Sequence, residues 1–137
     1  MAIFYADASA LVKLVGDEPE SGPLRSFIGA ADIVSSELVL TEVPRAIRRG
    51  ARDRAGLSLD LLLERAAQVL EAIALIPLDR AVLIAAGALA EPALRALDAI
   101  HVAAAVDVVP LQGFVSYDVR QAAAARLAGL RTFAPSG

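Results

Sequence analysis

Residues 3–14 constrain the fold more than any other stretch, because they join a strand to a helix at an acidic residue. The apolar run at 3–5 is too short for a helix, whereas Leu11 and Leu14 follow a helical spacing. Asp7 therefore lies where a buried strand ends and a helix begins. In an open parallel sheet, the carboxyl ends of the strands border the crevice in which ligands bind. The alternative role for Asp7 is to cap the helix, since Asp is a favoured N-cap residue.

The same alternation of short strands and helices continues to the end of the chain. We expect strands at residues 3–5, 32–34, 74–76, 113–116 and 130–133. Helices are predicted at residues 8–14, 20–30, 37–49, 58–70, 79–89, 93–109 and 119–127. Strands that alternate with helices are typical of an α/β domain with right-handed crossovers. We therefore predict one domain over residues 1–137, with a central, mainly parallel sheet of four to five strands.

Composition excludes several classes of protein. The longest uncharged apolar run, 81–90, is far shorter than the roughly 20 residues that span a membrane. The N-terminus lacks the basic region of a secretory signal, and Asp7 interrupts its apolar stretch. The chain has no cysteine, which excludes a disulfide framework and a thiolate metal site, so a cytoplasmic location fits. The net charge of −3 argues against a generally basic nucleic-acid coat.

The chain carries more apolar residues than a monomer of its size easily buries. Hydrophobic residues make up 57% of the sequence, against roughly 45–50% in typical soluble chains. We interpret the surplus as apolar surface for subunit or partner interfaces. A candidate surface is the set of leucines near the start of the fourth helix: Leu57, Leu59, Leu61, Leu62 and Leu63. The alternative is that all five belong to the core, which helix periodicity alone does not exclude.

Two further aspartates occupy informative positions. Asp118 follows the fourth strand almost directly and precedes a helix, so it repeats the position of Asp7 and shares the capping alternative. Asp98 lies in the segment 97–106, which is apolar nearly all round and therefore predicts a buried carboxylate. A buried carboxylate is costly unless it is paired or binds a metal. For Asp98 the alternatives are a pair with Arg95 or capping of a helix that starts late.

The helix predicted at 37–49 carries a fourth candidate acid, Glu42. Arg45 and Arg49 follow it at spacings of three and seven, so they share one side of the helix with Glu42. A solvated Glu–Arg pair is the alternative to a functional acid. His101 is the only histidine, and one histidine without cysteine is a poor zinc site. We expect His101 to pack or to support a neighbouring group, and not to act as a base.

The segments that carry these acids resemble motifs of the PIN domain, a nuclease fold, and specifically of VapC-type toxins from bacterial toxin–antitoxin pairs. The motifs are DASALVK at 7–13, TEV at 41–43, LDAIHVA at 97–103 and VSYD at 115–118, in the family's order over nearly the whole chain. The resemblance implies a three-layer α/β/α fold and a metal-dependent endoribonuclease whose acidic residues are Asp7, Glu42, Asp98 and Asp118. It also implies Ser9 as a nearby polar contact and Ser116 at a position where the family often has Thr.

The resemblance further implies partners. They are an RNA substrate, a cognate antitoxin and a second copy of the chain in a homodimer. We expect Arg45 and Arg49 to contact RNA phosphates or an acidic segment of the antitoxin. The leucine-rich helix then offers a dimer surface and a groove for an antitoxin helix.

Physical chemistry supports the metal independently of the resemblance. Four carboxylates in one crevice repel one another unless a divalent cation holds them, and oxygen ligands suit Mg²⁺ or Mn²⁺. Such an ion can activate water, orient a phosphodiester and stabilise the charge on the leaving oxygen. Our hypothesis is that Asp7 and Asp98 bind the metal directly. Asp118 then binds directly or through water, and Glu42 positions water or a second ion.

Other α/β proteins of this size fit the sequence less well. A phospho-receiver domain carries an acidic pair after its first strand and a lysine after a late strand, but Lys13 is the only lysine here. A haloacid-type phosphatase needs a second Asp two residues after Asp7, where Ser9 stands. The alternative that remains is a non-catalytic PIN-like module that binds RNA or protein, and the complete set of acids argues against it.

Overall fold

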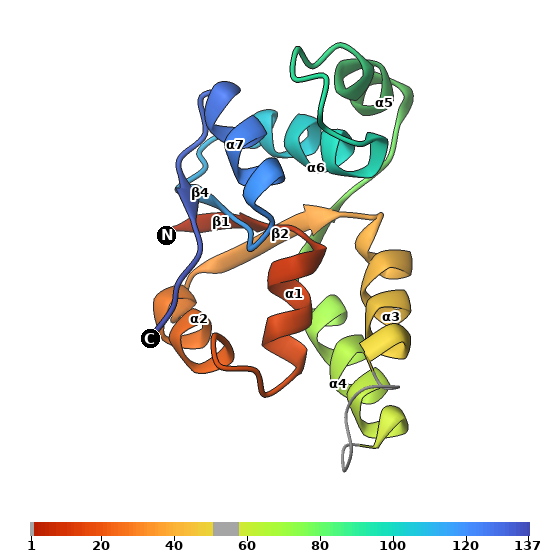
Figure 1. The fold of residues 1–137 in the computed structure, drawn as a ribbon, viewed down its shortest axis with the longest axis vertical. Coiled ribbons are helices and arrows are strands. Elements are labelled where there is room, and N and C mark those ends of the chain that lie inside the picture. Colours follow the sequence, from red (N-terminus) through yellow and green to blue (C-terminus); the bar gives the residue numbers. More distant parts are fainter. Residues whose placement is uncertain (1, 51–57) are drawn as a thin grey trace.

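One parallel sheet organises the chain. The computed structural model describes residues 2–50 and 58–137, and it contains a five-stranded sheet (Figure 1). The strands are β1 (Ile3–Ala6), β2 (Asp32–Ser36), β3 (Ala74–Ile76), β4 (Gly113–Val115) and β5 (Thr132–Phe133). Their order is β3-β2-β1-β4-β5, and each neighbouring pair is parallel. The predicted fold class is therefore confirmed.

β1 lies at the centre of the sheet, and its two neighbours come from distant parts of the chain. Tyr5 of β1 pairs with Val34 of β2 on one side and with Phe114 of β4 on the other. The chain first crosses from β1 to β2 and later returns to the opposite side of β1 as β4. The direction of winding thus reverses between β1 and β4. Ligands of open α/β sheets bind outside the carboxyl ends of the strands at such a switch point.

Helices cover both faces of the sheet and complete a three-layer α/β/α arrangement (Figure 1). One layer contains α1 (Ala8–Val15), α2 (Ser21–Ile28), α3 (Val39–Gly50) and α4 (Leu59–Ala72). The other contains α5 (Arg80–Gly87), α6 (Ala96–Val106) and α7 (Val119–Leu127). Among the helices of the described residues, none is long and apolar enough to cross a membrane.

Alternate residues of β1 serve two different cores. Phe4 and Ala6 pack in one core, together with residues of α1, α3 and α4. Tyr5 points to the opposite face and packs with residues of α5, α6 and α7. Its ring stacks on that of Phe114, with centroids 5.2 Å apart and planes 8° from parallel. Burial on both faces explains why β1 is a short continuous apolar run without polar alternation.

The leucines near the start of α4 do not form one exposed surface. Leu62 is buried, and Leu59 and Leu63 pack partly against the same core. Leu61 remains 43% exposed, while Leu57 lies outside the described residues. The predicted surface is therefore wrong for Leu62, which the helix turns inward to meet α1 and α3. Of the four described leucines, Leu61 is the one that is exposed to a partner.

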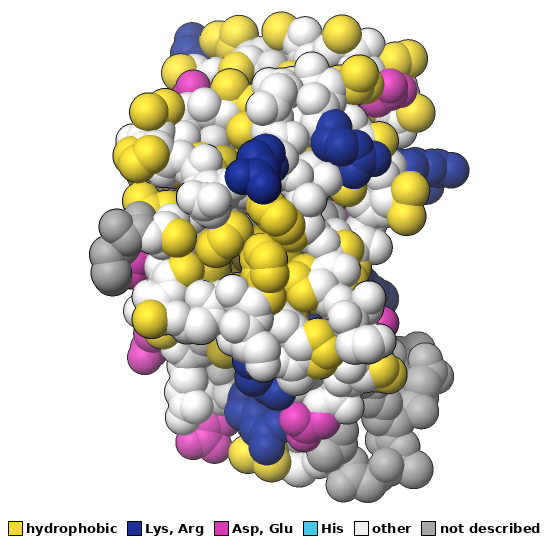
Figure 2. Space-filling view, turned by 90° about the vertical axis from the view of Figure 1, so that its left-hand side faces the viewer, with side chains coloured by type: hydrophobic (Ala, Val, Ile, Leu, Met, Phe, Trp, Pro, Cys, Tyr) yellow, Lys and Arg dark blue, Asp and Glu magenta, His cyan; other side chains and the backbone are white. Residues whose placement is uncertain are grey.

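Part of the apolar surplus nevertheless lies at the surface. Figure 2 shows hydrophobic side chains gathered in the middle of the face that carries α2 and α7, with Lys and Arg side chains above them. Large apolar side chains are exposed on the helices of the second layer in particular: Leu83, Ile84, Leu97, Val106, Val119 and Leu127. Contiguous exposed apolar surface is typical of proteins that associate.

Candidate active site

Asp7 is the buried acid at the switch point. It follows β1 directly and is 1% exposed. Its Oδ1 accepts hydrogen bonds from the backbone N–H of Ala10 (3.0 Å) and from the hydroxyl of Ser9 (2.6 Å). Its Oδ2 accepts a hydrogen bond from the hydroxyl of Ser116, which follows β4 (2.5 Å). The bond to Ala10 also caps α1, so the capping role is present together with contacts that capping does not need.

Burial and hydrogen bonding act on Asp7 in opposite directions. Burial raises the pKa of Asp7 above the ordinary value of a carboxyl group. The donated hydrogen bonds from Ser116, Ser9 and Ala10 lower that pKa, and so does the charge of His101. Both serine hydroxyls predicted as supporting groups thus contact the first acid directly. The protein surrounds a buried carboxylate with donors, which is the arrangement required to hold a negative charge away from water.

The segment after β4 carries Asp118 and connects it to the same centre. The backbone N–H of Asp118 donates to the hydroxyl oxygen of Ser116 (3.0 Å), and that of Tyr117 donates to the hydroxyl oxygen of Ser9 (3.0 Å). Asp118 is exposed, and its Oδ1 accepts a hydrogen bond from the N–H of Gln121 (3.0 Å), which caps α7. The two strand-to-helix junctions, after β1 and after β4, are therefore joined by serine hydroxyls.

Glu42 reaches the site from α3, and His101 of α6 holds it. Oε1 of Glu42 lies 2.6 Å from Nε2 of His101. The other ring nitrogen, Nδ1, lies 2.7 Å from the hydroxyl of Tyr5 in the central strand. Tyr5 and His101 are almost fully buried, at 0% and 1% exposure, whereas the side chain of Glu42 is 19% exposed. The neighbouring group that His101 was expected to support is therefore the carboxylate of Glu42.

Asp98 lies in the first turn of α6 and responds to the other three acids. Burial raises its pKa, and the negative charges of Asp118, Asp7 and Glu42 raise it further, while His101 lowers it. The other three carboxylates therefore lie within electrostatic reach of Asp98. The carboxylate is half-buried and not fully buried as predicted, because α6 begins only at Ala96 and leaves Asp98 in its open first turn.

Neither alternative for Asp98 holds in the described residues. Arg95 occupies the N-cap position of α6 without a capping side chain, and it forms no ion pair with Asp98. A negative charge in the first turn of a helix is favoured by the helix dipole. Within the described residues, the helix dipole of α6 stabilises the charge of Asp98, and no ion pair does. The Glu–Arg alternative for Glu42 also fails, since His101 is the group that contacts it.

The acids supply oxygen ligands of the kind that Mg²⁺ and Mn²⁺ prefer. Within residues 2–50 and 58–137, however, no three His, Cys, Asp or Glu side chains are grouped closely enough to hold a metal ion in this arrangement. The reason is visible in the hydrogen bonds: Asp7 faces the serines, Asp118 faces its own helix and Glu42 faces His101. The residues fit a cation in kind and charge, and holding one requires the carboxylates to turn toward each other.

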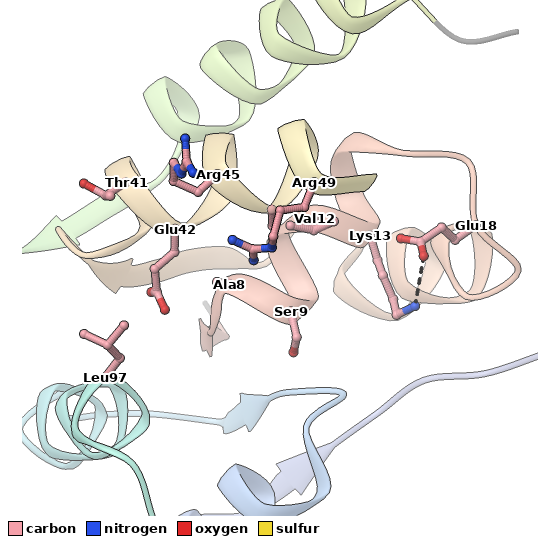
Figure 3. A pocket seen from close by; sticks show the side chains of 11 residues that line it. Ala8, Ser9, Val12, Lys13, Glu18, Thr41, Glu42, Arg45, Arg49 and Leu97 are labelled. Atoms are coloured by element: carbon pink, nitrogen blue, oxygen red, sulfur yellow. Dashed lines mark ion pairs between the residues drawn. The ribbon is translucent and has the colours of Figure 1, made fainter. Parts of the chain in front are cut away.

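A cleft of about 550 Å³ opens beside Glu42 and Ser9 and extends between α1, α3 and the start of α6 (Figure 3). Its lining includes Arg45 and Arg49, the two cations predicted to share a side of the helix with Glu42. Figure 3 shows the guanidinium of Arg49 turned into the cleft, whereas that of Arg45 points to the other side of α3. The two arginines therefore differ in the direction of their guanidinium groups relative to the cleft, although both side chains are exposed.

Two residues of this site were not predicted from the sequence. Lys13 lines the cleft, where its Nζ lies 3.0 Å from Oε2 of Glu20 and 5.0 Å from the centre of the Tyr117 ring. Tyr5 is the buried partner of His101. Successive side chains of a strand point to opposite faces of the sheet, so Tyr5 points away from the face of Phe4 and Ala6. That alternation could have placed the Tyr5 hydroxyl on the side of α6.

Known proteins share the sequence pattern of this chain. The family model of the PIN domain matches residues 4–127. Ribonuclease VapC46 of Mycobacterium tuberculosis (strain ATCC 25618 / H37Rv) is 40% identical, over 99% of this chain and 100% of its own length. Ribonuclease VapC47 of M. tuberculosis (strain CDC 1551 / Oshkosh) is 34% identical, with 97% of each chain covered.

A solved structure shares the fold. It is the crystal structure of PAE2754 from Pyrobaculum aerophilum, with a TM-score of 0.64 at 20% identity, over 96% of this chain and 83% of that one. The PIN model spans every element from β1 to α7, including all four acids and both serines. Together with the full-length match to VapC ribonucleases, this span shows that the chain belongs to the PIN-domain family and, within it, to the VapC type.

Proposed function

We propose that this protein is a metal-dependent endoribonuclease, the toxin of a toxin–antitoxin pair, formed by a single nuclease domain over residues 1–137. Membership of the PIN-domain family supports a nuclease, and the names of the VapC ribonucleases that match over nearly their full length support RNA as the substrate. The observation that carries the proposal is the electrostatic contact among the acids. Asp118, Asp7 and Glu42 all raise the pKa of Asp98, although they come from three other segments of the chain.

The proposed site consists of Asp7, Glu42, Asp98 and Asp118 around Mg²⁺ or Mn²⁺. A bound divalent ion supplies an activated water and neutralises charge on a phosphodiester during its hydrolysis. Asp7 and Asp98 serve as direct ligands, because the first is buried at the switch point and the charges of the other three acids act on the second. Asp118, which is exposed, binds directly or through water, and Glu42 positions the attacking water or a second ion.

Ser9 and Ser116 orient the Asp7 carboxylate, and their hydrogen bonds lower its pKa against the effect of burial. Each hydroxyl donates to a different oxygen of the carboxylate, so the group cannot rotate without breaking a bond on one side. The same hydroxyl oxygens accept from backbone N–H groups of Tyr117 and Asp118, which fixes the direction of the donated protons. A carboxylate held in this way is preorganised for a cation that approaches from the cleft.

We propose that RNA enters along the cleft that Arg45 and Arg49 line. Both residues line the cleft beside Glu42, so a phosphate bound there lies near the acids. Arg49 turns into the cleft and is the stronger candidate for that contact (Figure 3). The cleft also has apolar lining, including Val12 and Leu97, which suits the second proposed occupant, an antitoxin segment with both acidic and apolar side chains.

The remaining proposals concern assembly and location. Exposed apolar side chains support a homodimer, with Leu61 as the exposed member of the leucine group on α4. A cognate antitoxin is proposed because the chain belongs to the VapC type. A cytoplasmic location follows from the proposed toxin role, in which RNA and the antitoxin are both inside the cell.

The experiment that tests the proposal is cleavage of RNA by pure protein in the presence of Mg²⁺ or Mn²⁺ and then with excess EDTA. We expect internal cleavage with either metal and none with EDTA. A non-catalytic PIN-like module would bind the RNA under both conditions without shortening it. Cleavage that persists unchanged in EDTA would refute the metal requirement, and binding without cleavage would refute the enzyme.

A further inference from the structure

A buried chain of two hydrogen bonds connects the middle of the sheet to Glu42. The Tyr5 hydroxyl lies 2.7 Å from Nδ1 of His101, and Nε2 of His101 lies 2.6 Å from Oε1 of Glu42. Tyr5 belongs to β1, His101 to α6 in one helical layer and Glu42 to α3 in the other. The chain thus crosses all three layers beside the strand-to-helix junction that carries Asp7.

The first two members of this chain are rigidly held. The ring of Tyr5 stacks on Phe114 at 5.2 Å and meets the ring of His101 edge-on at 5.8 Å. Neither side chain is exposed by more than 1%. A close-packed interior restricts side chains to one rotamer, so the Nε2 atom of His101 has one direction available. Glu42 is the only member with solvent access, and it receives its orientation from the other two.

The hydrogen-bonding groups define which atom donates to Glu42. Burial raises the pKa of Tyr5, so the phenol keeps its proton and can donate it to Nδ1. A neutral imidazole that accepts at Nδ1 has its proton on Nε2, and a charged imidazole has a proton on Nε2 as well. Glu42 is an acceptor when ionised, so the Nε2–H group donates to Oε1. Each donor of the chain therefore meets an acceptor.

We propose that Tyr5 and His101 are positioning residues for Glu42, which hold its Oε1 atom and leave Oε2 to face the cleft. This inference rests on the proposed function, because Glu42 is assigned there to the metal or its water. Figure 3 shows the Glu42 carboxylate extending from α3 toward α6, beside Leu97 at the cleft wall. Within the described residues, no hydrogen bond to Oε2 accompanies the one to Oε1. One oxygen is thus engaged and the other is available.

His101 acts through Glu42 and does not exchange protons with the substrate. Outer groups that orient a metal ligand contribute typically 10–100-fold to metal affinity or activity. A rigid Nε2–H donor also keeps Glu42 from turning toward Arg49, whose guanidinium lies in the same cleft (Figure 3). Loss of the donor should therefore reduce the rate of cleavage at saturating RNA and leave the apparent RNA affinity nearly unchanged.

The donor proton on Nε2 can be observed directly, because His101 is the only histidine in the chain. Protein with ¹⁵N-labelled histidine, kept metal-free with EDTA, gives one pair of ring-nitrogen signals. We expect a protonated Nε2 in wild type and a changed Nδ1 signal in Tyr5→Phe. A wild-type ring without a proton on Nε2, or a ring that Tyr5→Phe leaves unchanged, would overturn the proposal.

Kinetics separate positioning from folding. His101→Gln keeps an amide donor toward Glu42, whereas His101→Ala keeps none, so kcat should fall about 10–100-fold in His101→Ala and be partly restored in His101→Gln, with KM unchanged in both. Tyr5→Phe should lower kcat by a smaller factor. The control is Thr132→Val, which removes a side-chain hydroxyl of the edge strand β5, bonded to Arg126, and should leave kcat unchanged.

The outcomes distinguish this inference from the proposed function. If wild type cuts no RNA with Mg²⁺ or Mn²⁺, the proposed ribonuclease is refuted, while the histidine signals still decide whether the hydrogen-bond chain exists. If wild type cuts RNA and all folded His101 variants cut it equally fast, positioning is refuted and the ribonuclease stands. Circular dichroism melts of each variant identify a loss of rate that comes only from unfolding.

Discussion

The hydroxyl of Ser116 donates a hydrogen bond to Oδ2 of Asp7 across the boundary between β4 and β1 (2.5 Å). The two residues are far apart in sequence, and they meet because Ala6 of β1 pairs with Val115 of β4. Each residue is the first one after its strand. The register of β1 against β4 thus brings a hydrogen-bond donor to Asp7. That donor stabilises the ionised carboxylate, which burial disfavours.

Removal of that donor should cost stability in a pH-dependent way. Ser116→Ala leaves one oxygen of the buried carboxylate without its donor, which should reduce the free energy of unfolding by about 1–3 kcal/mol at neutral pH. The pKa of Asp7 is already raised by burial and should rise further without Ser116. The reduction in the free energy of unfolding should be largest where Asp7 is ionised, and it should become smaller as the pH falls through the raised pKa of Asp7.

Urea unfolding of metal-free wild type and Ser116→Ala over a pH series measures this loss. Ser21→Ala is the matched control, because Ser21 is equally buried and its hydroxyl accepts from a backbone N–H group, that of Glu18. The loss in Ser21→Ala should not vary with pH in the same range. A loss in Ser116→Ala that is equal at every pH would show that Asp7 does not respond to it.

Asp98 should oppose stability without metal and support it with metal. Its raised pKa means that the folded state disfavours the ionised form, so stability falls as the pH rises from the ordinary carboxyl range through that pKa. Metal-free Asp98→Asn should therefore melt higher than wild type at neutral pH, by about 1–3 °C, since solvent screens a half-buried charge. Thermal melts in EDTA measure the difference.

The same melts with Mn²⁺ test ligation. An ion that binds only the native state stabilises it by mass action, so wild type should gain and Asp98→Asn should gain much less. Asp60→Asn is the control for a helix effect, because Asp60 also lies in the first turn of its helix, α4, and should melt slightly lower with a normal response to Mn²⁺. Equal gains in wild type and Asp98→Asn would mean that Asp98 is not a ligand.

Arg49 should contribute more to RNA binding than Arg45. Loss of one phosphate contact weakens binding and reduces the salt dependence by about one charge. We expect that result for Arg49→Ala, a smaller effect for Arg45→Ala and the largest for the double variant. Arg48→Ala is the control, since Arg48 is exposed on the same helix but does not line the cleft. Titrations at several salt concentrations, with catalysis blocked by EDTA, give the slopes, and an unchanged double variant would refute the contact.

Association can be tested at the one exposed leucine of α4. Leu61 is 43% exposed, so Leu61→Lys should leave the fold intact and shift a homodimer toward monomer, whereas Leu62, which is buried, serves the core. Light scattering at micromolar concentration measures the mass. A monodisperse wild-type monomer would contradict the homodimer, and a dimeric Leu61→Lys would place its surface on other helices.

The sequence predicted those parts of the site that depend on local pattern. Asp7 and Asp118 stand at strand-to-helix junctions, and both junctions could be located from a short apolar run followed by a helical spacing. Ser116 followed only from the resemblance to PIN-domain motifs, and its bond to Asp7 depends on the pairing of β1 with β4, which no local pattern encodes. For the same reason the contact between His101 and Glu42, from helices in different layers, could not be predicted.

Boundaries were harder to predict where the usual capping signals are absent. α6 begins after Arg95, whose side chain makes no capping hydrogen bond, so nothing in the sequence distinguishes residue 96 from residue 93 as the start. That difference decides the burial of Asp98. The consecutive leucines of α4 posed a similar problem, because an uninterrupted apolar run has no helical period that separates the buried Leu62 from the exposed Leu61.

The central claim is that four carboxylates act together on RNA, and the most direct measurement is RNA cleavage by their amide variants with Mn²⁺. Glu71→Gln is the control, since Glu71 is an exposed acid of α4 outside the site. We expect near-wild-type cleavage by Glu71→Gln and a loss of about 100-fold or more in each variant of the site: Asp7→Asn, Glu42→Gln, Asp98→Asn and Asp118→Asn. Full activity in folded Asp98→Asn would contradict the central claim.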